Sequence, residues 1–133
     1  MIRLCDDNET EVRRLRVLAV AAACHPNWGS EPGLGWGWVE ARARRHDVSV
    51  IVGERDGNRA AIATRLDADP ELRQHLRVHY VPRVAPTWLE CRIPPLYYKR
   101  YAGWHWQAYE LARQLTQQST FDLVHQVNMI GYR

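Results

Sequence analysis

The residues with the clearest chemical potential lie where an apolar segment gives way to glycine and proline. Residues 25–38 read HPNWGSEPGLGWGW, and they follow residues 17–24, which contain no polar side chain. Gly33 and Gly35 lack a Cβ atom, so the backbone there can turn sharply and approach a ligand closely. A helix that opens from such a loop directs unpaired N–H groups into it, which favours a bound phosphate. We therefore expect an anion-binding loop after a first strand.

Polar side chains near the ends of other apolar runs are further candidates for ligand contacts. His125 lies within the last apolar run and Asn128 follows it, while His25 comes directly after the first run. Open α/β sheets bind ligands at the carboxyl ends of their strands, which favours a substrate-binding role for these residues. A histidine in a buried strand is often hydrogen-bonded only to its neighbours, so that interpretation also stays open for both histidines.

The elements that must position these residues alternate along the chain. Four apolar runs are typical of strands, at residues 17–24, 48–52, 76–81 and 121–127. Helical periodicity predicts three helices between them, at residues 32–45, 58–66 and 96–118. Pro32 suits a first helical turn, and Asn58 is expected to be the N-cap of the second helix. Asp69 and Pro70 are expected to end that helix.

This alternation predicts an α/β fold with a parallel sheet between two layers of helices. For a Rossmann-like, doubly wound sheet the expected strand order is 3-2-1-4, which places the glycine loop and the end of the fourth strand at the topological switch point. Residues 15–133 are expected to form this partial domain, and the polar residues 1–14 a poorly ordered leader. An uncovered fourth strand would be a long apolar edge, so we expect the chain to be part of a longer protein.

Composition narrows the classes of partner. The chain carries 18 basic and 15 acidic residues with a net charge of +3, and no nucleic-acid motif, so nucleic acid is not an expected partner. Cys5, Cys24 and Cys91 form no C-x-x-C pair, so neither a disulfide framework nor a metal site is expected. The absence of a secretory signal and of any apolar run of about 20 residues predicts a cytoplasmic protein, and peripheral attachment at the inner face of the membrane stays open.

Several strings together resemble the acceptor-side, N-terminal domain of family-4 glycosyltransferases of GT-B fold. They are WGSEPGLGWGW, RHDVSVIV, ERDGNR and FDLVHQVN, with the long aromatic helix between the last two. The most specific is Ser30-Glu31-Pro32-Gly33 with Gly35-Trp36, because an S-E-P-G-x-G-W string marks one branch of that family. The resemblance covers residues 16–133. It implies glycan biosynthesis by retaining transfer of a sugar from a nucleotide-sugar donor to a glycan or other hydroxyl acceptor, with no metal and no further cofactor.

The resemblance also implies roles for particular residues. Backbone N–H groups of a donor-phosphate loop would stabilise charge on the leaving nucleotide; its residues are Ser30, Glu31, Gly33, Leu34 and Gly35. The acceptor-binding residues would be His25, Arg55, Asn58, Arg59, His125 and Asn128. Glu54 takes the place of the threonine that begins the family's T-R-x-x-N-R turn. Simpler interpretations of these residues stay open. Gly33 and Gly35 could serve only a tight turn, and Glu31 could only interact with the helix dipole. Asn58 could only cap a helix, and Arg55 and Arg59 could be solvated on the surface.

The resemblance covers only one of the two domains that such an enzyme needs. The donor-binding half with its pair of glutamates has no counterpart here, so we expect no catalytic residue and no activity without a C-terminal GT-B domain. One alternative is a stand-alone Rossmann-like module that binds a phosphate-bearing metabolite or nucleotide. An NAD-dependent oxidoreductase ranks lower, because Trp38 replaces the third glycine of G-x-G-x-x-G and no acidic residue closes the second strand near Val52, Glu54 being the nearest.

Overall fold

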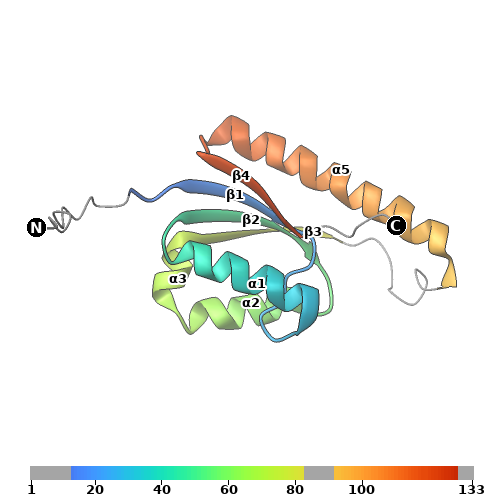
Figure 1. Cartoon of the computed structure of the whole chain (residues 1–133), viewed down its shortest axis with the longest axis horizontal. Coiled ribbons are helices and arrows are strands. Elements are labelled where there is room, and N and C mark those ends of the chain that lie inside the picture. Colours follow the sequence, from blue (N-terminus) through green and yellow to red (C-terminus); the bar gives the residue numbers. More distant parts are fainter. Residues whose placement is uncertain (1–12, 83–91, 129–133) are drawn as a thin grey trace, which may run out of the picture.

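Strands and helices alternate along the parts of the chain that the computed structural model describes, residues 13–82 and 92–128 (Figure 1). In chain order the elements are β1 (Arg16–Ala21), α1 (Ser30–Ala43), β2 (Asp47–Glu54), α2 (Asn58–Asp67), α3 (Pro70–His75), β3 (Leu76–Pro82), α5 (Pro94–Gln118) and β4 (Leu123–Asn128). Of the expected leader, residues 1–14, only Arg13 and Arg14 lie within the described residues.

The four strands form one parallel sheet in the order β3-β2-β1-β4. This confirms the predicted α/β class, the Rossmann-like arrangement and the strand order. Val17 on β1 pairs with Val48 on β2 and with Leu123 on β4. Because all strands run the same way, their carboxyl ends share one rim of the sheet, which we call the carboxyl rim, and their amino ends share the opposite rim.

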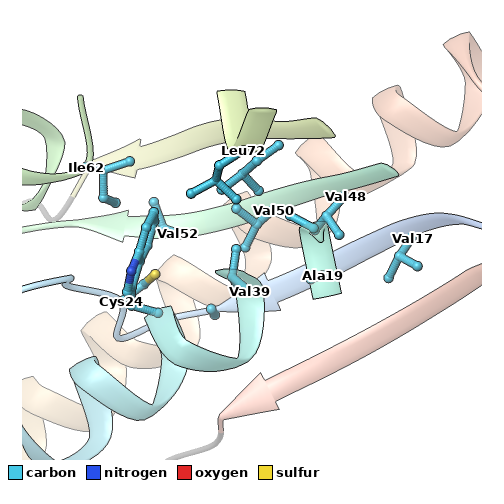
Figure 2. Close-up of a cluster of buried hydrophobic side chains, with 13 residues drawn as sticks. Val17, Ala19, Cys24, Val39, Val48, Val50, Val52, Ile62 and Leu72 are labelled. Atoms are coloured by element: carbon cyan, nitrogen blue, oxygen red, sulfur yellow. The ribbon is translucent and has the colours of Figure 1, made fainter. Parts of the chain in front are cut away.

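Helices cover both faces of the sheet, with α1, α2 and α3 on one side and α5 on the other (Figure 1). Alternate β2 residues Val48, Val50 and Val52 face the first layer, where they pack with Val39 of α1 and Leu72 of α3 (Figure 2). The intervening side chains face α5, as strand geometry requires. Leu18, Ile51 and Val81 make a second buried cluster there with Trp104 and Ala108.

The long helix α5 packs as its periodicity predicts. Tyr101, Trp104 and Ala108 are buried, and the Trp104 indole N–H donates to the carbonyl oxygen of Val81 at 3.3 Å. Trp106, two residues further on, is exposed because it lies on the opposite side of the helix. The helix therefore contributes one apolar stripe to the core and leaves its outer side to solvent.

Several element boundaries differ from the sequence-based expectations. Helix α1 begins at Ser30 instead of Pro32, and β2 extends to Glu54, so an acidic residue does close the second strand. The N-cap of α2 is Gly57, not Asn58, because the turn needs a left-handed residue there, with φ of 73°. Pro70 starts a short helix, α3, that the sequence analysis missed; the Asp69 carboxylate caps it by accepting from the N–H of Leu72 at 3.1 Å.

Charged side chains join the three helices of the first layer. Arg44 of α1 donates to the Asp69 carboxylate at 2.5 Å, and Arg65 of α2 donates to Glu40. The hydrogen bond from Arg44, with that from the Leu72 N–H, lowers the pKa of Asp69 from 3.8 to about 2. Folding therefore favours the ionised form of this carboxyl group.

We expect the stabilising effect of the Asp69 charge to depend on pH. Because its pKa is lower in the folded than in the unfolded chain, the contribution is complete above the unfolded value of 3.8 and disappears as the pH falls toward about 2. Asp69→Asn keeps a capping oxygen but removes the charge. Thermal unfolding should show a variant less stable than the original chain at pH 7, with the gap closing between pH 4 and pH 2. Asp67→Asn, which removes an exposed ion pair with Arg73, is the control, and its stability relative to the original chain should change little with pH. A stability difference between Asp69→Asn and the original chain that stayed constant down to pH 2 would contradict the argument.

Candidate functional site

The predicted site lies on the carboxyl rim of the sheet, where β1 has β2 on one side and β4 on the other. Residues 22–29 leave β1 there and lead into α1. Ala21, the last residue of β1, pairs with Asn128, the last residue of β4. The glycine segment and the end of the fourth strand, distant in sequence, therefore meet on one rim, as the sequence analysis expected.

Asn58 binds the loop after β1 from the β2 side. Its side chain is 1% exposed, and its amide N–H₂ donates to the carbonyl oxygens of Cys24 at 3.1 Å and Gly53 at 2.8 Å. Its side-chain oxygen accepts from the N–H of Arg55 at 3.1 Å. All three contacts are to the main chain, so Asn58 joins the loop to the end of β2, and the structure gives it a positioning role in place of the expected cap.

Asn128 binds the same loop from the β4 side. Its amide N–H₂ donates to the carbonyl oxygen of Ala23 at 2.7 Å, and its oxygen accepts from the N–H of the same residue at 3.4 Å. The two asparagines thus bind the consecutive residues Ala23 and Cys24. Their use as loop supports was the feature that sequence reasoning missed, although their positions, at the end of one strand and the start of one helix, marked them as candidates.

Gly33 and Gly35 have a packing reason to be glycine. A Cβ atom on Gly33 would lie 2.1 Å from the carbonyl oxygen of Trp28, and one on Gly35 would lie 2.1 Å from that of Ala23 and 2.9 Å from the Asn128 amide nitrogen. The loop backbone therefore lies directly against the first turns of α1. This is the close approach that glycine permits, and it holds whether or not a phosphate binds nearby.

The amino end of α1 has no side-chain cap. Its N-cap, Gly29, makes no side-chain hydrogen bond to the first-turn N–H groups, so no side chain replaces an anion there. Ser30 is exposed and has a left-handed φ of 56°, which costs a non-glycine residue about 1 kcal/mol. Glu31 is half-buried and Leu34 is exposed. The donor-phosphate role expected for this loop stays a prediction.

His25 and Trp28 pack against each other over a small hollow beside the loop. Their rings stack at 5.0 Å, and the His25 Nδ1 accepts from the N–H of Asn27 at 3.1 Å. The hollow is lined by Ala23, Cys24, His25, Trp28, Pro32, Arg55, Asp56 and Asn58, and its volume of about 10 Å³ admits roughly one water molecule. The hollow is too small for a sugar ring, and the Trp28 side chain beside it is 45% exposed.

The two arginines expected to bind an acceptor both have carboxylate partners. Arg55 donates to Asp56 at 2.6 Å. Arg59 makes a bidentate pair with Glu54 at 2.8 and 2.9 Å, and its guanidinium lies 4.3 Å from the centre of the Tyr80 ring. An anionic acceptor would therefore compete with these carboxylates, whereas hydroxyl groups would accept from guanidinium N–H groups that remain.

His125 lies in the middle of β4 and not at its carboxyl end. It pairs with Ala19, which places it on the α1 face, and its ring stacks on Trp38 at 4.6 Å with the planes 4° apart. Asn128 is the β4 residue that reaches the loop. The structure therefore brings together His25, Asn58, Asn128 and the glycines, and places His125 further down the strand.

Cys24 lies in the loop but is not a nucleophile. Its thiol is buried, and desolvation raises its pKa to about 12, so it is neutral at ordinary pH. Among residues 13–82 and 92–128 no group of three or more His, Cys, Asp or Glu side chains could hold a metal ion. In the same residues, no helix has the length and apolar character needed to cross a membrane.

The fold and this rim define a Rossmann-like α/β protein with its candidate site at the topological switch point. No family model matches the chain, and neither a curated protein nor a solved structure matches it. The function is therefore inferred from the residues and their geometry.

We expect alanine at position 35 to destabilise the chain, because a Cβ atom there overlaps the Ala23 carbonyl. Overpacking of this kind typically costs about 1–3 kcal/mol. Gly37→Ala is the matched control in the same helix, since its Cβ would meet nothing within 4 Å, and it should stabilise by up to about 1 kcal/mol. Urea unfolding of both variants measures the difference; equal stability would show that the loop does not lie against α1.

Asn58→Ala should be destabilising because it leaves buried carbonyl oxygens of Cys24 and Gly53 without their donor. Each unsatisfied group costs about 1–3 kcal/mol, so we expect a loss of roughly 3 kcal/mol in the free energy of unfolding. Asn27→Ala, an exposed asparagine of the same loop, should change it by less than about 0.5 kcal/mol. Similar losses for the two variants in urea unfolding would refute the positioning role of Asn58.

Proposed function

We propose that this chain is the acceptor-side, N-terminal part of a retaining glycosyltransferase that moves a sugar from a nucleotide sugar to a hydroxyl acceptor. The observation that carries the proposal is the loop of residues 22–29, which lies on the carboxyl rim at the switch point and leads into α1 with the S-E-P-G-x-G-W string in its first turns. Clefts at this position are where open α/β sheets bind phosphorylated ligands.

In this proposal α1 acts on the leaving group of the donor. Its amino end carries about half a positive charge, and Gly29 provides no competing side-chain cap. The Asn58 and Asn128 hydrogen bonds fix the loop beforehand, so the N–H groups need little rearrangement when charge develops on the diphosphate. Nucleoside recognition and the catalytic groups belong to a second domain, and no residue of this chain is assigned to bond making.

The acceptor would lie beside the loop, near His25 and Trp28. Trp28 offers an exposed aromatic surface for a sugar ring, and the free positions on the Arg55 and Arg59 guanidiniums offer hydrogen-bond donors to hydroxyl groups. A cytoplasmic location, with the acceptor at a membrane surface as one option, is part of the same proposal.

The second candidate is a stand-alone module that binds a phosphate-bearing metabolite, favoured by the open amino end of α1. One observation favours an oxidoreductase, and two count against it. Glu54 does close β2, as a ribose-binding acid would, but Arg59 already binds both of its oxygens. In addition, Gly33 and Gly35 lie within α1 and not in a short turn directly after β1.

Calorimetry with UDP, GDP and NAD⁺ separates these functions. The glycosyltransferase proposal predicts dissociation constants above about 1 mM for all three with this chain alone, because the nucleoside contacts lie elsewhere. Micromolar binding of UDP or GDP would favour the stand-alone module, and selective binding of NAD⁺ would favour the oxidoreductase.

The positive test uses the DNA that follows the codon for Arg133. A reading frame that continues into a second Rossmann-like unit, whose product releases nucleoside diphosphate from a nucleotide sugar, supports the proposal. In that product the exposed Ser30 hydroxyl would be a further hydrogen-bond donor to the diphosphate. Ser30→Gly removes this hydroxyl and accepts the left-handed φ, so it should slow transfer about tenfold or more without loss of stability. Gly37→Ala, on α1 with no neighbour within 4 Å, should leave the rate unchanged. A stop codon after Arg133, in a stable and monodisperse protein, would contradict the proposal.

A further inference from the structure

A second concave site lies at the opposite, amino rim of the sheet, on the face that α5 covers. It has a volume of about 500 Å³, within the range of small-molecule sites. Its lining comes from the first residues of β1, β2 and β3, from the end of α3, and from the end of α5 with the segment that follows it. The polar residues used in the proposal are Arg16, Asp47, Ser49, Arg77, His79 and Gln118. We call it the amino-rim hollow.

The register of the strands explains how its polar groups come together. Ser49 pairs with Arg77 on β3 and with Leu18 on β1, two residues after Arg16. Side chains two residues apart share a face, so Arg16, Ser49 and Arg77 all project toward α5. Two strand spacings, about 10 Å, separate β1 from β3, a gap that two arginine side chains can reach across around one phosphate-sized group.

The charges in the hollow favour an anion. Within the described residues neither the Arg16 nor the Arg77 guanidinium forms an ion pair; Arg16 lies over the Phe121 ring at 5.9 Å. The Asp47 carboxylate is already bound by the Nδ1 of His75 at 2.7 Å. The carboxyl end of α5 adds about half a negative charge, and together with the Asp47 carboxylate this stays below the two full charges of the guanidiniums.

His79 adds a group that can respond to the ligand. It is half-buried, and desolvation together with the Arg77 charge lowers its pKa, so the ring is neutral at pH 7. A neutral imidazole can donate one hydrogen bond to a bound oxygen, as can the Ser49 hydroxyl. A bound anion would oppose the effect of Arg77 and raise the pKa again.

We propose that the amino-rim hollow binds a small metabolite through a phosphate or carboxylate group held by Arg16 and Arg77, with Ser49 and His79 as further hydrogen-bond partners. This site is separate from the carboxyl-rim loop and does not depend on the function proposed for it. The two strand-borne arginines select the negative charge, and uncharged lining residues such as Val48, Leu115 and Gln118 accommodate the rest of the molecule.

NMR titration of the chain with inorganic phosphate, pyrophosphate and succinate tests the proposal. We expect saturable shifts at Ser49 and His79 with a rise in the His79 pKa, and a dissociation constant that increases at least fivefold in Arg16→Gln and in Arg77→Gln. Tighter binding of the phosphates or of succinate identifies which anionic group the site prefers. Arg45→Gln removes an exposed arginine that does not line the hollow and is the matched control for net charge.

Three results would overturn the proposal. The first is a set of NMR shifts spread over all surface arginines, and the second is a loss of anion affinity in Arg45→Gln equal to that in the test variants. The third is no shift at Ser49 or His79 with about 20 mM anion, a concentration that detects even dissociation constants in the millimolar range. Both test arginines are exposed, so the variants should fold, and circular dichroism of each variant checks this before titration.

Discussion

Two buried asparagine side chains determine the course of the connection between β1 and α1. Asn58 binds the Cys24 carbonyl from the β2 side, and Asn128 binds the Ala23 peptide from the β4 side. Because an unsatisfied buried polar group is costly, each amide admits one loop path and excludes others. The closeness of the loop to Gly33 and Gly35 follows from that path.

The packing of the glycine segment is compatible with the ligand binding proposed for it. The absence of Cβ atoms lets the loop lie on α1, while the same closeness brings the first-turn N–H groups to the rim. Ser30 keeps a side chain at a left-handed position, where glycine would be less strained. Residues held in such conformations tend to occur at functional sites, and Ser30 is the exposed hydroxyl nearest the amino end of α1.

The sequence predicted the strand order well, because apolar runs alternating with amphipathic helices permit few right-handed parallel arrangements. Prediction from the sequence failed where one residue has two roles. Asp69 and Pro70 both end α2 and begin α3, so a stop signal concealed a short helix. Asn58 resembled a cap but is buried beneath the turn, and His125 resembled a rim residue although its strand continues to Asn128. Such roles depend on tertiary contacts that no local pattern records.

The length of β2 has an electrostatic consequence. In a parallel strand, the seven steps from Asp47 at one rim to Glu54 at the other span about 23 Å. At physiological ionic strength exposed charges are screened over about 8 Å, so exposed charges at the two ends of β2 interact only weakly. Communication between the two ends would require a mechanical shift of the strand against its neighbours, and the continuous pairing of β2 with β1 and β3 resists such a shift. The two rims of this sheet can thus differ in ionic character without influencing each other.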